Sequence, residues 1–213
     1  MRARTETRQG SPPEDRSGKA GVRVFRFALG VLLAITLLTS GFSLLHAQSN
    51  SERAGEYQVK AAFLFNFAKF VEWPADALPN EHSPIVIGIL GEDPFGHILD
   101  ETVLGKNING HELQIERAKS VQELKGCQII FVSSSERKHF SEILKNLQGT
   151  DVLTVGETEG FAPGGGIIQL TLRDNRVRLT VNVEAAGRAR LKISSRLLAL
   201  AEITHDNPRG GGG

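Results

Sequence analysis

Three short, uninterrupted apolar runs constrain the fold of this chain more than any other feature. They lie in residues 83–93, 128–135 and 151–157, and the first two precede segments with helical spacing of apolar residues, 94–105 and 136–149. Continuous apolar runs of this length are typical of strands that are covered on both faces. Their alternation with helices predicts an α/β fold, with a single domain and a mainly parallel sheet flanked by helices on both faces.

Shorter elements fill the intervals between these runs. Residues 107–110 predict a turn, and residues 111–119 alternate apolar and polar side chains as in a half-exposed strand. Ser120 is placed to cap a short helix over 121–125, and Ser135 to cap the helix over 136–149.

Residues 164–183 predict a C-terminal antiparallel β-hairpin that turns at Asp174-Asn175, because both residues tolerate the positive φ of a tight turn. Counting outward from this turn gives the pairs on the face toward the core: Leu172 with Val177, Leu170 with Leu179, and Ile168 with Val181. The other face then carries Arg173, Arg176, Arg178, Thr171 and Thr180. We therefore expect one apolar and one basic face.

The residues after the hairpin predict helix and then disorder. Residues 184–203 fit one or two short helices, with Ser194 or Ser195 as a cap. Residues 204–213, rich in glycine, predict a disordered tail.

The segment EYQVKAAFLFNFAKFVEWP, residues 56–74, holds six aromatic side chains among Lys60, Asn66 and Lys69. Its apolar residues follow helical spacing, and they cover an arc too broad for a helix that lies on a surface. The segment is too short and too charged to span a membrane, and Pro74 should end the helix. We expect a mostly buried helix at the core of the domain.

The N-terminal residues predict export. Residues 1–26 have seven Arg or Lys and three acidic residues and predict a disordered basic leader, and residues 27–45 carry no charge. This order is typical of a secretory signal whose apolar segment is residues 27–47, and cleavage after Ala47 would remove residues 1–47. The apolar run is also long enough to serve as a retained N-terminal membrane anchor. In both cases the domain, residues 56–203, is exported.

The exported part holds 18 basic and 21 acidic residues, so its net charge is near −3 and nothing indicates nucleic-acid binding. Cys127 is the only cysteine, which excludes an intramolecular disulfide. Its apolar surroundings favour a small buried side chain over a reactive thiol.

Signals for catalysis are weak. The six histidines have no ligand-like spacing, and Ser133 to Ser135 with His139 lack a nucleophile elbow. The glycines of residues 88–96 fail the dinucleotide and P-loop spacings. Residues 162–167, APGGGI, form either a turn before a strand or a backbone anion nest. We expect no catalytic residue, no metal site and no cofactor.

Basic residues gather near the C-terminus of this net acidic domain. Between Arg173 and Arg196 there are seven basic and two acidic residues. Charged residues in such a cluster usually lie on a solvent-exposed face. Guanidinium groups also bind carboxylates, phosphates or an acidic partner. The predicted ligand- or partner-binding residues are Arg173, Arg176, Arg178, Arg188 and Arg190.

Five motifs follow one another from about residue 56 to residue 203. They are the aromatic helix, GILGEDPFG, GCQIIFVS, VLTVGETEGFAPGGGII and VRLTVNVEAAGRARLKISSRLLALA. This order resembles the YfiR-like family of bacterial periplasmic proteins. The more specific residues of the first and last motifs are Asn66, Trp73, Pro74, Asn182, Lys192 and Ser194.

The resemblance implies a periplasmic regulator rather than an enzyme. Members similar to this chain bind the periplasmic sensor domain of a membrane-bound diguanylate cyclase and repress it, which lowers cyclic di-GMP and favours motility over biofilm. An outer-membrane lipoprotein can sequester the repressor, and homodimers and small ligands are associated with the family. The best-known member relies on paired cysteines, so its redox control does not extend to this chain. The alternative is a periplasmic receptor for a small anionic ligand, without a cyclase partner.

Overall fold

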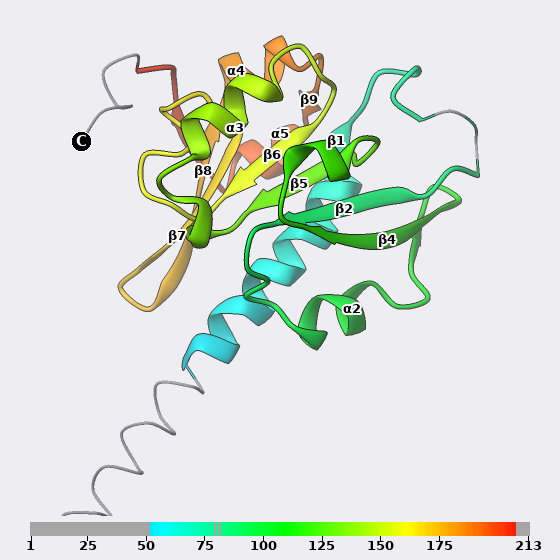
Figure 1. The fold of residues 1–213 in the computed structure, drawn as a ribbon, viewed down its shortest axis with the longest axis horizontal. Helices are drawn as coiled ribbons and strands as arrows, with labels where there is room; N and C mark the ends of the chain where they lie inside the picture. Colours follow the sequence, from blue (N-terminus) through cyan, green and yellow to red (C-terminus); the bar gives the residue numbers. More distant parts are fainter. Residues whose placement is uncertain (1–51, 79, 81, 208–213) are drawn as a thin grey trace, which may run out of the picture. The chain divides into compact units, whose positions relative to one another are not determined.

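An eight-stranded mixed sheet organises residues 52–78, 80 and 82–207, the part of the chain that this computed structural model describes (Figure 1). The strand order is β10-β8-β7-β6-β5-β2-β4-β3. Neighbours are parallel from β7 through β4 and between β10 and β8, whereas β7 with β8 and β3 with β4 are antiparallel. The predicted leader and the signal or anchor segment, residues 1–47, lie outside the described residues.

The three apolar runs are confirmed as buried parallel strands. They form β2 (Ile85–Leu90), β5 (Ile129–Val132) and β6 (Leu153–Gly156), and every residue of β5 and β6 is buried. Strand β4 (His111–Ala118) is half exposed, as its alternation predicts, and pairs with the short β3 (Asn107–Ile108). Residues 107 and 108 thus belong to a strand, and only Asn109 and Gly110 of the predicted turn form the turn.

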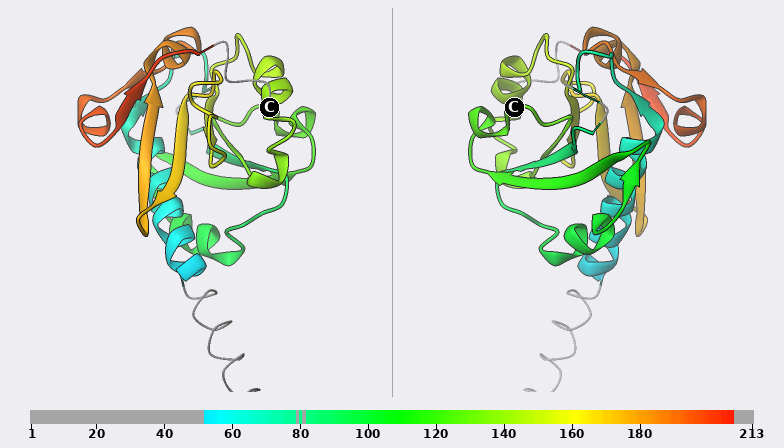
Figure 2. Two further views of the ribbon diagram at one scale, coloured as in Figure 1. Left: turned by 90° about the vertical axis from the view of Figure 1, so that its left-hand side faces the viewer. Right: turned by 90° about the vertical axis from the view of Figure 1, so that its right-hand side faces the viewer.

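Helices cover both faces of the sheet, which confirms the predicted fold class. One hydrophobic cluster joins the sheet to the helix of residues 52–70 and to α2 (His97–Val103), α4 (Val183–Arg188) and α5 (Ser195–Leu198). A second cluster joins the other face to α3 (Phe140–Asn146) and the 3-10 turn η1 (Val121–Leu124). Figure 2 shows the cyan N-terminal helix and the yellow-green α3 on opposite sides of the sheet.

The aromatic helix is a core element, as predicted, but it ends before Pro74. Its inner face is buried at Ala61, Leu64 and Phe67, while the outer aromatic rings are half buried. After residue 70 the chain forms strand β1 (Val71–Glu72), which pairs with β9 (Lys192–Ile193). This pairing, rather than the proline, ends the helix.

The two predicted serine caps have different outcomes. Ser120 forms a capping box with Glu123 at η1, as predicted. Ser135 does not cap α3, because its hydroxyl accepts a hydrogen bond from the amide of Glu92 at 2.9 Å and so joins the loops that follow β2 and β5. A separate 3-10 turn, η2 (Ser134–Glu136), stands before α3, and Ser133 caps that turn.

Gly156 and Gly166 make room for Phe161, whose side chain is fully buried. A Cβ added at Gly166 would lie 2.2 Å from its ring, and one added at Gly156 would lie 2.4 Å away. The amides of residues 164–167 donate to carbonyls within the loop or to the Thr154 hydroxyl. These amides are therefore occupied, and the alternative of an anion nest in residues 162–167 is wrong.

The hairpin of β7 (Ile168–Arg173) and β8 (Arg176–Asn182) has the predicted register in all three apolar pairs. Asp174 and Asn175 have φ of 51° and 58°, as a tight turn with two left-handed residues requires.

Strand β10 (Glu202–Thr204) was not predicted. It pairs in parallel with the end of β8, so α5 stops well short of the predicted helix end at residue 203. Part of the predicted tail thus belongs to the fold, because Thr204 lies in β10 and Asp206 bonds to Asn182 and Arg188. Residues 208–213 lie outside the described residues.

Candidate functional site

The basic face of the hairpin brings three of the five predicted arginines together. Arg173 lies directly opposite Arg176, and Arg178 lies opposite Thr171, so the alternation of the strands puts all three guanidinium groups on one side. All three residues are exposed. Arg173 pairs with Glu159 at 2.7 Å, whereas neither Arg176 nor Arg178 has a salt bridge or hydrogen-bonded partner within the described residues. Two unneutralised cations therefore stand near the tip of the hairpin.

The opposite face of the hairpin is apolar and only partly covered. Leu170 and Leu179 are buried against the core, but Leu172 is 44% exposed and Val177 is half buried. A groove of about 440 Å³ separates this end of the hairpin from the first turns of the N-terminal helix. Its lining comprises Glu52, Gly55, Glu56, Val59, Leu172, Asn175, Arg176 and Val177. The prediction that this apolar face packs against the core is therefore correct for Leu170 and Leu179 and wrong for Leu172, near the turn of the hairpin.

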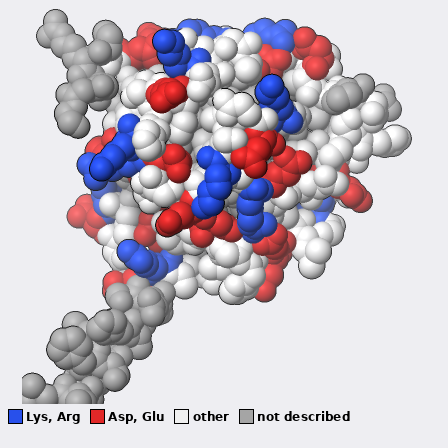
Figure 3. Space-filling view, in the orientation of Figure 1, with Lys and Arg blue, Asp and Glu red and all other residues white. Residues whose placement is uncertain are grey.

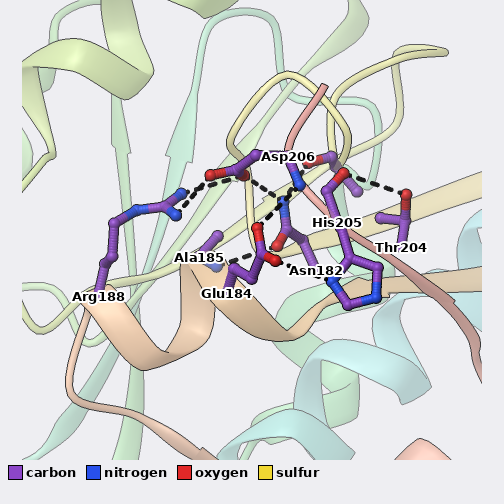
Figure 4. A network of polar contacts seen from close by, with 8 residues as sticks. Asn182, Glu184, Ala185, Arg188, Thr204, His205 and Asp206 are labelled. Atoms are coloured by element: carbon purple, nitrogen blue, oxygen red, sulfur yellow. Dashed lines mark hydrogen bonds and ion pairs between the residues drawn. The ribbon is translucent and has the colours of Figure 1, made fainter. Parts of the chain in front are cut away.

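Arg188 does not join the hairpin arginines. From the last turn of α4 it reaches Asp206 with both terminal nitrogens, at 2.5 and 3.1 Å (Figure 4). This forked contact lowers the pKa of the Asp206 carboxyl below its usual range, and a hydrogen bond from Asn182 lowers it further by a smaller amount.

Asn182 anchors the same network from inside the fold. Its side chain is fully buried, and its amide nitrogen donates to the carbonyl of Ala162 at 2.8 Å and to Asp206 at 2.7 Å. Its side-chain oxygen accepts from the amide of Ala185 and so caps α4. The amide of Asp206 donates to Glu184, which completes the attachment of the C-terminal segment to α4 (Figure 4).

Arg190 is also engaged within the fold. Its guanidinium contacts both carboxylate oxygens of Asp151 and lies 3.1 Å from Asp76. The hydrogen bond from Arg190 lowers the pKa of Asp76. Arg188 and Arg190 therefore hold separate segments of the fold together, and of the five predicted arginines only Arg176 and Arg178 have no salt bridge within the described residues.

Charge on the molecular surface is mixed rather than segregated. Figure 3 shows lysine and arginine side chains interspersed with aspartate and glutamate over one face of the molecule. No broad field of one sign covers this face.

The other motif residues contribute contacts within the fold. The indole of Trp73 donates to the carbonyl of Gln128 at 3.3 Å, and Ser194 caps α5 through the amide of Leu197. Asn66 donates to the carbonyl of Ala62 in its own helix. Lys192 lies in β9 with its side chain exposed, and the carbonyl of Pro74 accepts from the amide of Ala77.

A buried ion pair that the sequence analysis did not predict lies beside the aromatic helix. The Lys60 ammonium is 2% exposed and lies 2.7 Å from Glu157, which is 4% exposed, and 2.5 Å from Glu56. The hydroxyl of Tyr57 and the amide of Ser134 also donate to Glu157. Burial alone would raise the pKa of Glu157, but Lys60 and Ser134 outweigh it and hold that pKa below the usual value.

The region near Cys127 has no reactive thiol. Cys127 is 3% exposed, and burial, together with the nearby Glu116 carboxylate, raises the pKa of its thiol to about 12. It borders a cavity of about 480 Å³ at the amino ends of β5 and β6, which includes Leu124, Leu147 and Val152 in its lining.

Among the described residues, no group of three His, Cys, Asp or Glu side chains is placed to hold a metal ion. No helix among these residues has the length and apolar character needed to cross a membrane.

Comparisons with known proteins give one matching family and partly similar structures. A family model described as YfiR/HmsC-like matches residues 57–202. Two solved structures are similar in part. One is an ABC domain in complex with L-Trp from Streptococcus pneumonia, 11% identical, with a TM-score of 0.43 and coverage of 56% of this chain and 55% of that one. The other is a conserved domain protein from Vibrio cholerae, 13% identical, with a TM-score of 0.43 and coverage of 62% and 56%. The chain therefore spans just over half the length of each, and no curated protein matches it.

Proposed function

This chain belongs to the YfiR/HmsC-like family, and on that premise we propose that it represses an inner-membrane diguanylate cyclase by binding the periplasmic sensor domain of that enzyme. The family match, which extends over residues 57–202, is the observation that carries this proposal. Repression lowers cyclic di-GMP and favours motility over biofilm, and an outer-membrane lipoprotein that sequesters the repressor would release the cyclase.

The hairpin is the surface that we assign to the cyclase. Arg176 and Arg178 are exposed and have no salt bridge within the described residues, so a partner carboxylate would gain charge-assisted hydrogen bonds without breaking an existing pair. Glu52 and Glu56 line the adjoining groove and would repel a small anion that entered it. An acidic protein surface therefore suits this site better than a free anionic ligand.

Redox control through a disulfide is not part of the proposal. The single cysteine, Cys127, is buried, and its thiol stays protonated at neutral pH because its pKa is raised to about 12. Regulation would come from competition between partners for the repressor.

Deletion of the gene is expected to raise cellular cyclic di-GMP, because the cyclase would lose its repressor. Mass spectrometry of nucleotide extracts measures this level, and expression of the wild-type chain in the deletion strain should restore the lower value. An unchanged level, together with no binding of the purified protein to the periplasmic domain of any diguanylate cyclase of the same cell, would refute the proposed function.

A further inference from the structure

The outer side of β8 is only partly paired. Strand β10 contacts Thr180–Asn182, so Arg176–Leu179 have no strand partner on that side within the described residues. We call this stretch the open edge of β8. Figure 1 shows the hairpin tip reaching beyond the neighbouring strands of the sheet.

The backbone of the open edge points outward at Val177. The amide of Asn182 donates to Ile167 on the β7 side, and amides along a strand alternate in direction, so even-numbered amides of β8 face β7. The direct pairing of Arg173 with Arg176 across the two-residue turn agrees with this direction. The N–H of Val177 therefore faces away from the hairpin, where another strand could pair with it.

The side chains beside the open edge differ between the two faces. Arg176 and Arg178 lie on the basic face, and Val177 lies on the apolar face together with Leu172 and the groove that contains Val59. A strand added to this edge would place its successive side chains on the same two faces. Acidic side chains on one face and apolar side chains on the other would complement both.

We infer that the open edge of β8 binds an extended partner segment with alternating acidic and apolar residues, by addition of a strand to the sheet. Main-chain hydrogen bonds to Val177 would supply affinity, and the arginines and the groove would supply specificity. This inference rests on the proposed function, since it specifies how the hairpin recognises the cyclase.

Charge disfavours two other candidate occupants of this edge, namely a second copy of β8 and the terminal segments of this chain. Two copies of β8 paired edge to edge would bring their Arg176 and Arg178 side chains together on one face, and like charges in that position are destabilising. The six residues after Asn207 carry one arginine and no acidic residue. The 51 residues before Glu52 carry only three acids, Glu6, Glu14 and Asp15, which do not alternate with apolar residues.

The test uses the purified full chain and a short fluorescent peptide of alternating glutamate and valine. The fluorescence polarisation of the acidic peptide should rise when the protein is added and should fall again when salt is added. A matched peptide of alternating lysine and valine should not bind. Val177→Pro removes the outward N–H without removing a bond to β7, and it should weaken binding about tenfold. Val177→Ala keeps that N–H and controls for the lost side chain.

A second peptide, tested on the wild-type chain, keeps the inference testable if Val177→Pro does not fold. An N-methylated acidic peptide, which cannot form the main-chain bonds, should fail to bind the wild-type chain. Equal binding of methylated and unmethylated peptides, no binding of any peptide, or self-association that depends on Val177 would overturn the inference. Arg176 and Arg178 would then only protect the edge from aggregation.

The proposed function can survive the failure of this inference. If Val177→Pro folds and represses the cyclase in cells as well as the wild type, strand addition is wrong while repression stands. If the peptide binds as expected and gene deletion leaves cyclic di-GMP unchanged, the site stands while the proposed function fails.

Discussion

Substitution of Glu157 by glutamine is expected to lower the free energy of unfolding by about 3 kcal/mol, the lower end of the range for breaking a buried ion pair. The substitution leaves the Lys60 ammonium, 2% exposed, without its buried counterion. Glu56 lies 2.5 Å from the same ammonium and limits the loss. Urea-induced unfolding, followed by the fluorescence of the single tryptophan, measures the change.

Glu56→Gln is the matched control, because it removes the more exposed of the two carboxylates and keeps the pair of Lys60 with Glu157. Its cost should be no more than about 1 kcal/mol. Replacement of both buried partners, Lys60→Met with Glu157→Leu, should cost less than the loss of Glu157 alone. Equal costs for Glu157→Gln and Glu56→Gln would contradict the assigned role of the buried pair.

Acid should reduce the difference between the wild type and Glu157→Gln. The pKa of Glu157 is lower in the folded state than its ordinary value of 4.5, so the folded protein binds a proton there less readily than the unfolded chain does. The stabilisation is present above that ordinary value and is lost as the pH falls through the lower folded pKa. The variant lacks this titration and should lose less stability over the same range.

Substitution of Asn182 by alanine is expected to cost about 2–4 kcal/mol, from the loss of a helix cap and of a buried hydrogen-bond donor. The change removes the cap on α4, leaves the carbonyl of Ala162 without that donor, and detaches Asp206 from the core. Thermal and urea denaturation both measure the loss.

Asn66→Ala is the control for this prediction. Asn66 belongs to the other specific motif, but its half-buried side chain bonds only a carbonyl of its own helix, so the change should stay within about 0.5 kcal/mol. If the two alanine substitutions cost the same, Asn182 does not hold the C-terminal segment in the way described.

The sequence predicts the parts of this fold that depend on local periodicity. The buried strands β2, β5 and β6 follow from continuous apolar runs, and the hairpin register follows from a turn that only residues tolerant of positive φ can form. Strand β10 was not predicted, because the apolar residues of 195–203 have helical spacing and indicate a helix. Each residue of Glu202–Thr204 pairs with a residue at the end of β8 that lies 22 positions earlier in the chain.

Contacts between distant residues explain why the candidate site was predicted only in part. The five arginines lie close together in the sequence, but two of them have partners elsewhere in the fold. Arg188 pairs with Asp206, and Arg190 pairs with Asp76, which is 114 residues away. Lys60 and Glu157 are 97 residues apart, so neither residue signalled the buried pair. Arg173, Arg176 and Arg178 could be placed on one face, because strand alternation alone fixes that relation.

The most direct test of the account is the level of cyclic di-GMP in a strain whose chromosomal copy encodes Arg176→Gln and Arg178→Gln. A strain with Lys138→Gln and Lys145→Gln, which removes two exposed charges at and before α3, is the control, and immunoblots confirm equal amounts of each protein. We expect the arginine variant to raise cyclic di-GMP to the level of the gene deletion and the lysine variant to match the wild type. A wild-type level in the arginine variant would contradict the assignment of the hairpin as the surface that represses the cyclase.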